Sequence, residues 1–360
     1  MTVTTTHAID HPITFIKGDQ EGQVLMDKSL DALAGLVSLD LHPFDLSLEA
    51  RLKSGDRTTR DAAASLLHTK VGLKAPTITQ GAATDGPRLP SPNITLRRGI
   101  DGVAIVRVAN LIPGVTPPNR YLTGPIAVIR KATEGIYEAM EWQTEDATRV
   151  YRQEHMSVTK MQALARFAVS FAIENRMTLW SATKHTISRT FEGTLQRILD
   201  ETAQSAVADQ GLRYQPWLID ATYQGLMRPP ERLAIVCDNF NGDCLGDLVP
   251  AMFGSVAGCG SILVGEDGCR MFDPPHGTAP TLYNLDRANP LATLIAISGA
   301  VAYAARLSGN EKAEAFGKRI KQAAFDTIEA GIATFDLIGE DQAVGTSKYL
   351  EAVRERLQGS

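Results

Sequence analysis

Short apolar runs alternate along the chain with longer stretches whose apolar residues recur at helical spacing. A short apolar run between turn residues is typical of a buried strand, whereas a spacing of three and four is typical of an amphipathic helix. The runs predict strands at residues 13–17, 71–74, 103–109, 125–130, 178–182 and 233–237. The helical spacing predicts helices at residues 24–36, 164–172, 188–206, 291–307 and 311–331. This alternation predicts an α/β protein in which helices flank a sheet.

Individual stretches add detail to this pattern. The helix at 291–307 is apolar on nearly every side and is predicted to be buried, whereas mixed charges place the helix at 311–331 on the surface. Residues 81–92 and 113–118 are rich in turn formers and interrupt the pattern. Residues 1–10 carry no signal-peptide pattern and are expected to form a frayed tail. No G-x-G-x-x-G motif follows the first strand, so a nicotinamide cofactor would not occupy a standard Rossmann site.

Composition and charge narrow the class of protein. A chain of 360 residues can bury a large core and is expected to form two lobes. The net charge of −5 argues against a general binder of nucleic acid or anionic membranes. No apolar run is long enough to span a membrane. The four cysteines have no CxxC spacing, which indicates a reducing compartment without disulfides, and Cys237 and Cys259 are interpreted as core thiols. We therefore expect a cytoplasmic protein.

Two carboxylates follow the apolar run at 233–237. Asp243 and Asp247 are four residues apart, and a helix that begins after Gly242 would place both on one face. Two carboxylates beside a cleft can hold a hard divalent cation, although Asp243 alone could equally cap a helix. The loop from His276 to Pro280 would contribute backbone groups at a ligand pocket. Together these features suggest a metal-assisted dehydrogenase.

Three arginines lie upstream of these carboxylates. Arg107 and Arg130 lie in or end strand-like apolar runs, and Arg97 follows the polar segment that begins at Ser91. A guanidinium in such a place is costly unless it meets an anion. For any one of the arginines an ordinary salt bridge is the favoured explanation. Three guanidinium groups in one pocket would suit a di- or tricarboxylate.

The order and spacing of these segments resemble the β-decarboxylating dehydrogenases, the family of isocitrate, isopropylmalate, homoisocitrate and tartrate dehydrogenases. The resemblance covers about residues 13–330. It runs through residues 74–79, 91–97, 105–107, 130–135, 137, 184, 220, 239–247, 276–280 and 289–290. It implies the family's two-lobed α/β dimer, which is not a standard Rossmann fold. Residues 1–101 with 255–360 would form a large cofactor-binding lobe. Residues 102–254 would form a small lobe that contains the dimer interface and a clasp at about 137–160.

The resemblance also assigns roles to individual residues. Tyr137 and Lys184 match the catalytic acid and base. Arg97, Arg107 and Arg130 match the clamps for the substrate's carboxylates, and Ser91 and Asn93 match the positions that contact its variable arm. Asp243 and Asp247 match metal ligands, and Asp220 matches a third ligand that the neighbouring subunit contributes together with Lys184. The residues that match the cofactor site are Thr79, His276, Gly277, Thr278, Ala279, Pro280, Thr281 and Asn289.

The implied activity is metal-dependent, NAD(P)-linked oxidative decarboxylation of a malate-type 2-hydroxy acid. Polar residues at Ser91 and Asn93 favour a second charged arm, and therefore isocitrate, which would yield 2-oxoglutarate. Lys131 and Ala132 replace the family's usual Glu and Asn and add positive charge near the arginines. The replacement is either a bystander pair swap or the mark of a more anionic substrate. This leaves a phosphonate analogue such as phosphonomethylmalate as an alternative. A non-catalytic regulatory or binding subunit is a second alternative.

The expected cofactors are Mg²⁺ or Mn²⁺ and a nicotinamide dinucleotide. The resemblance implies that NAD enzymes carry Asp after the position of Pro280, whereas NADP enzymes carry cations there. Thr281 and Leu282 match neither pattern, and the absence of a cation at these two positions favours NAD. NADP stays an alternative, because Arg228 or Arg287 could contact its 2′-phosphate. The expected partners are a small polycarboxylate or phosphonate and a second copy of the chain, with no nucleic acid and no membrane.

Overall fold

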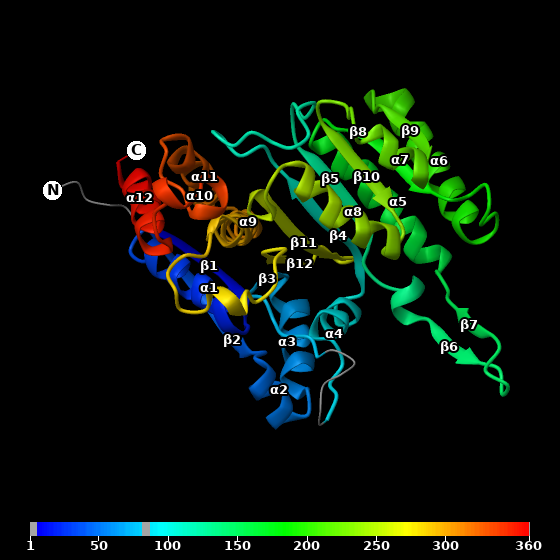
Figure 1. Cartoon of the computed structure of the whole chain (residues 1–360), viewed down its shortest axis with the longest axis horizontal. Coiled ribbons are helices and arrows are strands. Elements are labelled where there is room, and N and C mark those ends of the chain that lie inside the picture. The colour runs from blue at the N-terminus through cyan, green and yellow to red at the C-terminus, as the bar shows by residue number, and fades with distance from the viewer. Residues whose placement is uncertain (1–5, 81–86, 360) are drawn as a thin grey trace. The chain divides into compact units, whose positions relative to one another are not determined.

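The computed structural model describes residues 6–80 and 87–359 (Figure 1). The chain folds into two compact units. Unit 1 combines the described parts of residues 1–100 and 254–360 with the short segment 112–116. Unit 2 consists of residues 101–111 and 117–253. The chain therefore leaves unit 1 for unit 2 and returns to it, so that each unit is built from segments distant in sequence.

Unit 1 contains a mixed sheet with strand order β2-β1-β3-β12-β11. The strands β1, β2, β3 and β12 pair in parallel, whereas β11 and β12 pair antiparallel. Their bounds are β1 His7–Lys17, β2 Val37–Asp45, β3 Val71–Lys74, β11 Cys259–Gly265 and β12 Arg270–Asp273. The strand β3 is buried along its whole length, which is typical of a central parallel strand.

Helices cover both faces of this sheet. Phe15 packs in one core with α9 and α10, while the next residue toward the N-terminus, Thr14, is hydrogen-bonded to Ser65 and Thr69 of α3 at 2.8 Å each. Successive side chains of a strand point to opposite faces, so α9 and α3 lie on opposite sides of β1. The helices of unit 1 are α1 Gln20–Leu33, α2 Leu48–Ser54, α3 Arg57–Thr69, α4 Pro92–Gly99, α9 Leu291–Leu307, α10 Glu311–Glu329, α11 Phe335–Ile338 and α12 Thr346–Gln358.

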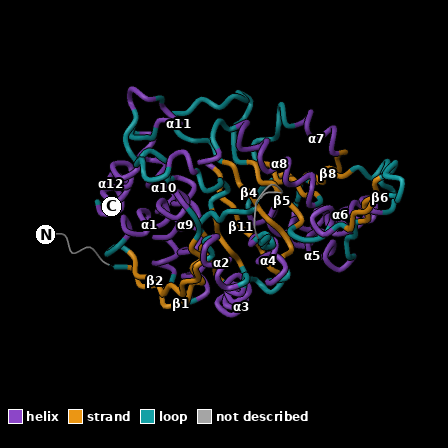
Figure 2. Tube along the Cα trace, turned by 60° about the horizontal axis from the view of Figure 1, so that its bottom comes forward, coloured by secondary structure: helices purple, strands orange, loops and turns teal. Residues whose placement is uncertain are grey.

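Unit 2 contains the strands β4, β5, β10, β8 and β9, in that order. All neighbours are parallel except β4 and β5. Helix α8 packs on β5 from one side, and α5 and α6 pack on the other strands from the opposite side (Figure 2). The bounds are β4 Gly102–Ala109, β5 Ile126–Lys131, α5 Val158–Glu174, β8 Thr178–Thr183, α6 Phe191–Gln210, β9 Tyr214–Leu218, α7 Ile219–Gly225, β10 Leu233–Cys237 and α8 Asn239–Met252.

A two-stranded hairpin extends from unit 2 (Figure 1). It pairs β6 Met140–Gln143 with β7 Val150–Gln153, and every residue of both strands is exposed. Trp142 stacks on Tyr151 across the hairpin, with ring centroids 5.5 Å apart. A single hairpin with both faces in water is marginally stable by itself.

Several predictions from the apolar pattern are confirmed. The α/β fold is correct, and the run at 233–237 and the buried helix at 291–307 have the predicted bounds. Other boundaries were wrong: the helices predicted at 24–36, 164–172 and 188–206 span 20–33, 158–174 and 191–210, and two further differences concern α8 and β1. Helix α8 begins at Asn239 rather than after Gly242, because Asp238 caps it. His7 to Asp10 belong to β1 rather than to a frayed tail, while residues 1–5 lie outside the described residues. Of the turn-rich segment 81–92, residues 81–86 also lie outside them.

The cysteines and the apolar helices complete the description. All four cysteines are free, and Cys237 and Cys259 are buried, as predicted for core thiols. Among the helices of the described residues, none has both the length and the hydropathy that crossing a membrane requires.

Candidate active site

One face of α8 carries the residues of the candidate site in unit 2. Asp238 caps the helix by accepting hydrogen bonds from the backbone N–H groups of Phe240 and Asn241, at 2.7 and 3.0 Å. A helix that starts at Asn239 brings residues at spacings of three and four onto one face. That face contains Asn239, Gly242, Asp243, Gly246 and Asp247.

The two glycines on this face leave room for arginine side chains. A Cβ on Gly242 would lie 2.5 Å from Cβ of Arg130, and a Cβ on Gly246 would lie 3.1 Å from Nη1 of Arg107. The distance at Gly242 is incompatible with normal packing, because carbon atoms in contact lie about 3.5–4.0 Å apart, and the distance at Gly246 is tight. Arg130 from β5 and Arg107 from β4 therefore pass along the bare helix backbone and reach the carboxylates one residue further on.

Arg130 lies at the centre of this arrangement and is only 4% exposed. Its Nε donates to Oδ1 of Asn239 at 2.8 Å, and its Nη1 donates to the carboxylate of Asp243. The hydroxyl of Tyr137 donates to the other oxygen of the same carboxylate, and the guanidinium lies 4.7 Å from the centre of the tyrosine ring. A buried guanidinium that is paired and hydrogen-bonded is held in one orientation.

Arg107 and Asp247 form a second ion pair, through Nη1 and Oδ1. The Asp247 side chain is 82% exposed, so water screens this pair strongly and it contributes little to stability. The exposure leaves Asp247 accessible to a ligand. Arg107 and Arg130 thus each neutralise one of the two carboxylates that the sequence predicts as metal ligands.

The donor set fits a hard divalent cation, because aspartate oxygens are the ligands that Mg²⁺ and Mn²⁺ prefer. In the described part of the chain, no three or more His, Cys, Asp or Glu side chains are arranged to hold a metal ion. Asp220 instead forms an ion pair with Lys184, at 2.8 Å. The hydrogen bond from Lys184 lowers the pKa of Asp220. The predicted residues therefore fall into two groups: Asp243, Asp247, Arg107, Arg130 and Tyr137 in one, and Lys184 with Asp220 in the other.

Lys131 does not add charge to this site, and that expectation was wrong. Adjacent residues of a strand point to opposite faces. Arg130 contacts α8, so Lys131 points away from it, and its ammonium is buried against the carboxylate of Glu134, at 2.6 Å, and the carbonyl of Thr133, at 2.8 Å. Burial lowers the pKa of Lys131, and the bond to Glu134 opposes this shift.

The turn between Lys131 and Tyr137 contains an unusual backbone conformation. Glu134 has φ 64° and ψ −166°, a region that normally only glycine occupies. Gly135 follows with φ 67°, and the 3₁₀ turn Gly135–Glu138 carries Tyr137. Such a conformation costs about 1–3 kcal/mol and persists only when surrounding contacts hold it in place.

The remaining predicted substrate residues belong to unit 1. Ser91 is the N-cap residue of α4, and its hydroxyl lies 3.5 Å from the hydroxyl of Thr79. Asn93 and Arg97 are four residues apart on α4 and therefore share one face of that helix. Thr79 is exposed and the other three residues are partly exposed, so all four are accessible to a ligand.

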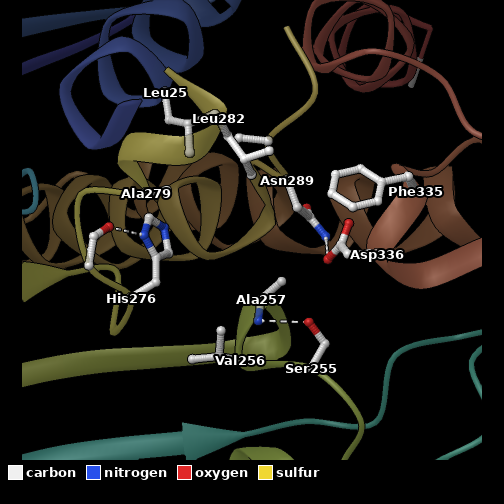
Figure 3. A pocket seen from close by; sticks show the side chains of 12 residues that line it. Leu25, Ser255, Val256, Ala257, His276, Ala279, Leu282, Asn289, Phe335 and Asp336 are labelled. Atoms are coloured by element: carbon white, nitrogen blue, oxygen red, sulfur yellow. Dashed lines mark hydrogen bonds between the residues drawn. The ribbon is translucent and has the colours of Figure 1, made fainter. Parts of the chain in front are cut away.

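A pocket in unit 1 contains part of the predicted cofactor site (Figure 3). Its volume is about 230 Å³, and several apolar side chains line it. The ring of His276 is bonded through Nδ1 to the carbonyl of Gly277, at 2.9 Å, so Nδ1 carries the proton. Burial lowers the pKa of His276, which keeps the ring neutral and leaves Nε2 as an acceptor without a partner among the described residues. The lining residues are Leu25, Ser255, Val256, Ala257, His276, Gly277, Ala279, Leu282, Ala288, Asn289, Phe335 and Asp336.

An apolar pocket with one unused buried acceptor fits the adenine of a nicotinamide dinucleotide, whose amino group is a donor. Asn289 donates to the carboxylate of Asp336 at 3.0 Å, beside Phe335 (Figure 3). Neither lysine nor arginine is among the residues that line the pocket. Arg287, which lies over the Phe335 ring at 4.5 Å, is paired with Glu340.

Other predicted cofactor residues take other positions. Thr278, Pro280 and Thr281 are not among the lining residues, and the hydroxyl of Thr278 donates to Gln20 at 2.7 Å. Pro280 and Thr281 form a short 3₁₀ turn.

Sequence reasoning missed several residues of these sites. Asn239 and Glu134 are buried polar residues that organise Arg130 and Tyr137, and neither was named as a site residue. The repeated Gly-Asp pair at 242–243 and 246–247 is a signal that could have identified the arginine path along α8. Phe335 and Asp336 follow the cofactor loop by more than forty residues, and no local pattern connects them to it.

The isocitrate/isopropylmalate dehydrogenase family matches residues 12–353. An NADP isocitrate dehydrogenase of Sphingobium yanoikuyae is 25% identical, with 97% of each chain covered. One of Thermus thermophilus is 28% identical, over 96% of this chain and 67% of its own. An isocitrate dehydrogenase structure from Ostreococcus tauri, in complex with isocitrate and magnesium(II), has a TM-score of 0.82 at 22% identity and covers 97% of this chain and 100% of its own. This chain therefore belongs to the isocitrate/isopropylmalate dehydrogenase family.

Proposed function

We propose that the protein catalyses metal-dependent, NAD(P)-linked oxidative decarboxylation of a malate-type 2-hydroxy acid, with isocitrate as the substrate and 2-oxoglutarate as the product. The observation that carries the proposal is the Asp243 carboxylate, which accepts hydrogen bonds from both Arg130 and Tyr137. In this proposal the guanidinium would bind an anion, the hydroxyl would donate a proton and the carboxylate would hold the metal, all within one set of contacts. Each of these groups has a use in the decarboxylation of a 2-hydroxy acid.

Tyr137 and Lys184 are assigned the proton transfers. Lys184, in its neutral amine form, would accept the proton of the substrate hydroxyl, and the Tyr137 hydroxyl would donate a proton to the carbon that loses CO₂. Arg107, Arg130 and Arg97 would bind the substrate's carboxylates by charge-assisted hydrogen bonds. Asp243 and Asp247, with Asp220 of a second copy, would hold a Mg²⁺ or Mn²⁺ ion. That ion would supply Lewis-acid polarisation of the substrate's oxygen when bound.

Isocitrate is preferred to a phosphonate analogue for three reasons. Lys131 is buried against Glu134 on the other side of β5, so the extra cation that favoured a phosphonate does not reach the arginines. The named relatives are isocitrate dehydrogenases. Ser91 and Asn93 are polar and partly exposed, which suits a carboxylate arm.

The units are assigned different tasks. Unit 1 would bind the dinucleotide at the His276 pocket, and unit 2 would supply the dimer interface. The exposed hairpin of β6 and β7 would form the clasp with a second copy, because its aromatic pair is otherwise left in water. A non-catalytic subunit is disfavoured, because Tyr137, Lys184 and the three aspartates are all present.

Substrate choice is the first test. The purified dimer with Mg²⁺ or Mn²⁺ should reduce the cofactor with isocitrate, at a kcat/KM at least about 100-fold above that for isopropylmalate, tartrate or phosphonomethylmalate, since an unmatched charged arm costs several kcal/mol. Cofactor reduction is followed by absorbance, with each acid and each dinucleotide. Turnover of the phosphonate alone would reject isocitrate as substrate. A folded, metal-loaded dimer that turns over none of the four acids would reject the enzyme assignment.

Cofactor choice is the second test. We expect NAD to give at least about tenfold higher kcat/KM than NADP, because the carboxylate of Asp336 lines the pocket and no lysine or arginine is among the lining residues. This departs from the relatives, which are NADP enzymes by name. Asp336→Asn should reduce the ratio of kcat/KM with NAD to kcat/KM with NADP, whereas the exposed control Asp341→Asn should leave this ratio unchanged. A tenfold preference for NADP would contradict the expectation and would point to Arg287 as the phosphate ligand.

A further inference from the structure

The buried Lys131–Glu134 ion pair lies outside the groups that the proposed chemistry uses. Both side chains are almost completely buried, and the Nζ–Oε2 distance is 2.6 Å. Ser157, the N-cap residue of α5, donates to the Glu134 carboxylate through its backbone N–H, at 3.0 Å, and through its hydroxyl. Burial raises the pKa of Glu134, but the bonds from Lys131 and Ser157 outweigh it and lower the pKa. The carboxylate is therefore ionised and fixed on all sides.

This carboxylate is attached to the strained backbone of the turn. Glu134 has the glycine-like φ and ψ described above, and its own N–H donates to the carboxylate of Glu138 at 3.1 Å. The N–H of Gly135 donates to the carbonyl of His155 at 2.9 Å. A residue other than glycine remains in this region only when its surroundings hold it there. The side chain of Glu134 is one such restraint, because its ionic partner Lys131 is buried with it.

The same turn reaches the candidate site from its other end. The carbonyl of Glu134 accepts a hydrogen bond from Nδ2 of Asn239 at 2.8 Å, and Oδ1 of Asn239 accepts from Arg130. Tyr137 follows three residues after Glu134 in the 3₁₀ turn, and its hydroxyl meets Asp243. The ion pair thus lies on one side of β5, and Tyr137 lies on the other.

We propose that the Lys131–Glu134 ion pair is a positioning device for Tyr137: it holds the strained turn at Glu134 and thereby fixes the direction in which the tyrosine hydroxyl donates its proton. Neither residue touches the reacting groups. The inference rests on the proposed function in assigning the proton donation to Tyr137, whereas the restraint on the turn does not depend on that assignment.

Amide hydrogen exchange, followed by mass spectrometry, tests the restraint independently of activity. Lys131→Met should speed exchange in residues 132–139 by about tenfold or more, because the bonds of this turn would open locally, while α10 should exchange as in the wild type. Lys318→Met removes an ammonium from an exposed pair with Glu314 and should change neither segment. Unchanged exchange in residues 132–139 of a folded Lys131→Met protein would overturn the inference, whether or not the enzyme is active.

Kinetics test the consequence for catalysis. Lys131→Met/Glu134→Gln removes both buried charges together and should melt closer to the wild type than either single variant. The kcat of this double variant should still fall by about 10- to 100-fold, because Tyr137 would be displaced by a fraction of an ångström. Its KM for the dinucleotide should be unchanged. Deuterium wash-in at C3 of 2-oxoglutarate should fall in parallel. A double variant with restored melting and wild-type kcat would show a merely structural pair, whereas an inactive wild type would reject the proposed function only.

Discussion

Replacing Asp243 by Asn is expected to lower metal-dependent kcat by about 10³-fold or more, which corresponds to roughly 4 kcal/mol of lost transition-state stabilisation. The side chain keeps its shape but loses its charge. It would then bind a divalent cation poorly and would no longer balance the buried guanidinium of Arg130. Asn still offers one oxygen to Arg130, and its amide N–H can donate to the Tyr137 hydroxyl in place of the lost acceptor, so the fold should survive.

The measurement is the initial rate as a function of Mg²⁺ or Mn²⁺ concentration, with a circular dichroism melting curve on the same sample. Asp209→Asn is the matched control, because Asp209 is an exposed carboxylate of the same unit on α6. The control should keep wild-type activity and metal dependence. If Asp243→Asn also kept them, Asp243 would not be a metal ligand.

Replacing Lys184 by Met is expected to lower kcat by about 10²- to 10⁴-fold, the usual contribution of a positioned general base. The variant also removes the hydrogen bond that lowers the pKa of Asp220, so that this pKa should rise toward its ordinary value. Steady-state rates measure the first effect, and carboxyl NMR titration measures the second. Lys53→Met, which breaks an exposed ion pair with Glu49, should change neither.

The same variant tests whether the active site is shared between two copies. Lys184→Met and Tyr137→Phe should each be nearly inactive as homodimers. If Lys184 acts in the site of the second copy, a mixed dimer has one site with both residues intact. Random mixing should then restore about a quarter of wild-type activity, since half of the dimers are mixed and each carries one good site. No recovery in verified mixed dimers would place Lys184 and Tyr137 of one chain in the same site.

The parts of the fold that could be predicted from the sequence are those buried on all sides. The strand β10 and the helix α9 are continuous apolar runs, so their bounds were readable without tertiary information. The hairpin strands β6 and β7 are exposed on both faces, and the edge strand β9 contains Pro216, so neither has an alternating pattern to detect. Their pairing depends on partners that a local pattern cannot identify.

The candidate site divides in the same way. The residue types at Arg130, Asp243 and Asp247 indicated an anion and a cation, and the structure brings these residues together. The direction of Lys131 was not predictable, because it depends on which face of β5 meets α8. The start of α8 was misplaced for a related reason. Gly242 and Gly246 resemble a helix start in the sequence, but in the structure they lie within α8 and leave space for the arginine side chains.

Those two glycines place α8 in a conflict between stability and function. An alanine in the interior of a helix is normally about 1 kcal/mol more favourable than a glycine. Replacing glycine by alanine is therefore a common way to raise the stability of a protein. Here the added methyl group at Gly242 would meet Arg130 at a distance shorter than packing allows. The helix must therefore remain weaker than its length permits, and the search for a thermostable form of this enzyme should begin elsewhere in the chain.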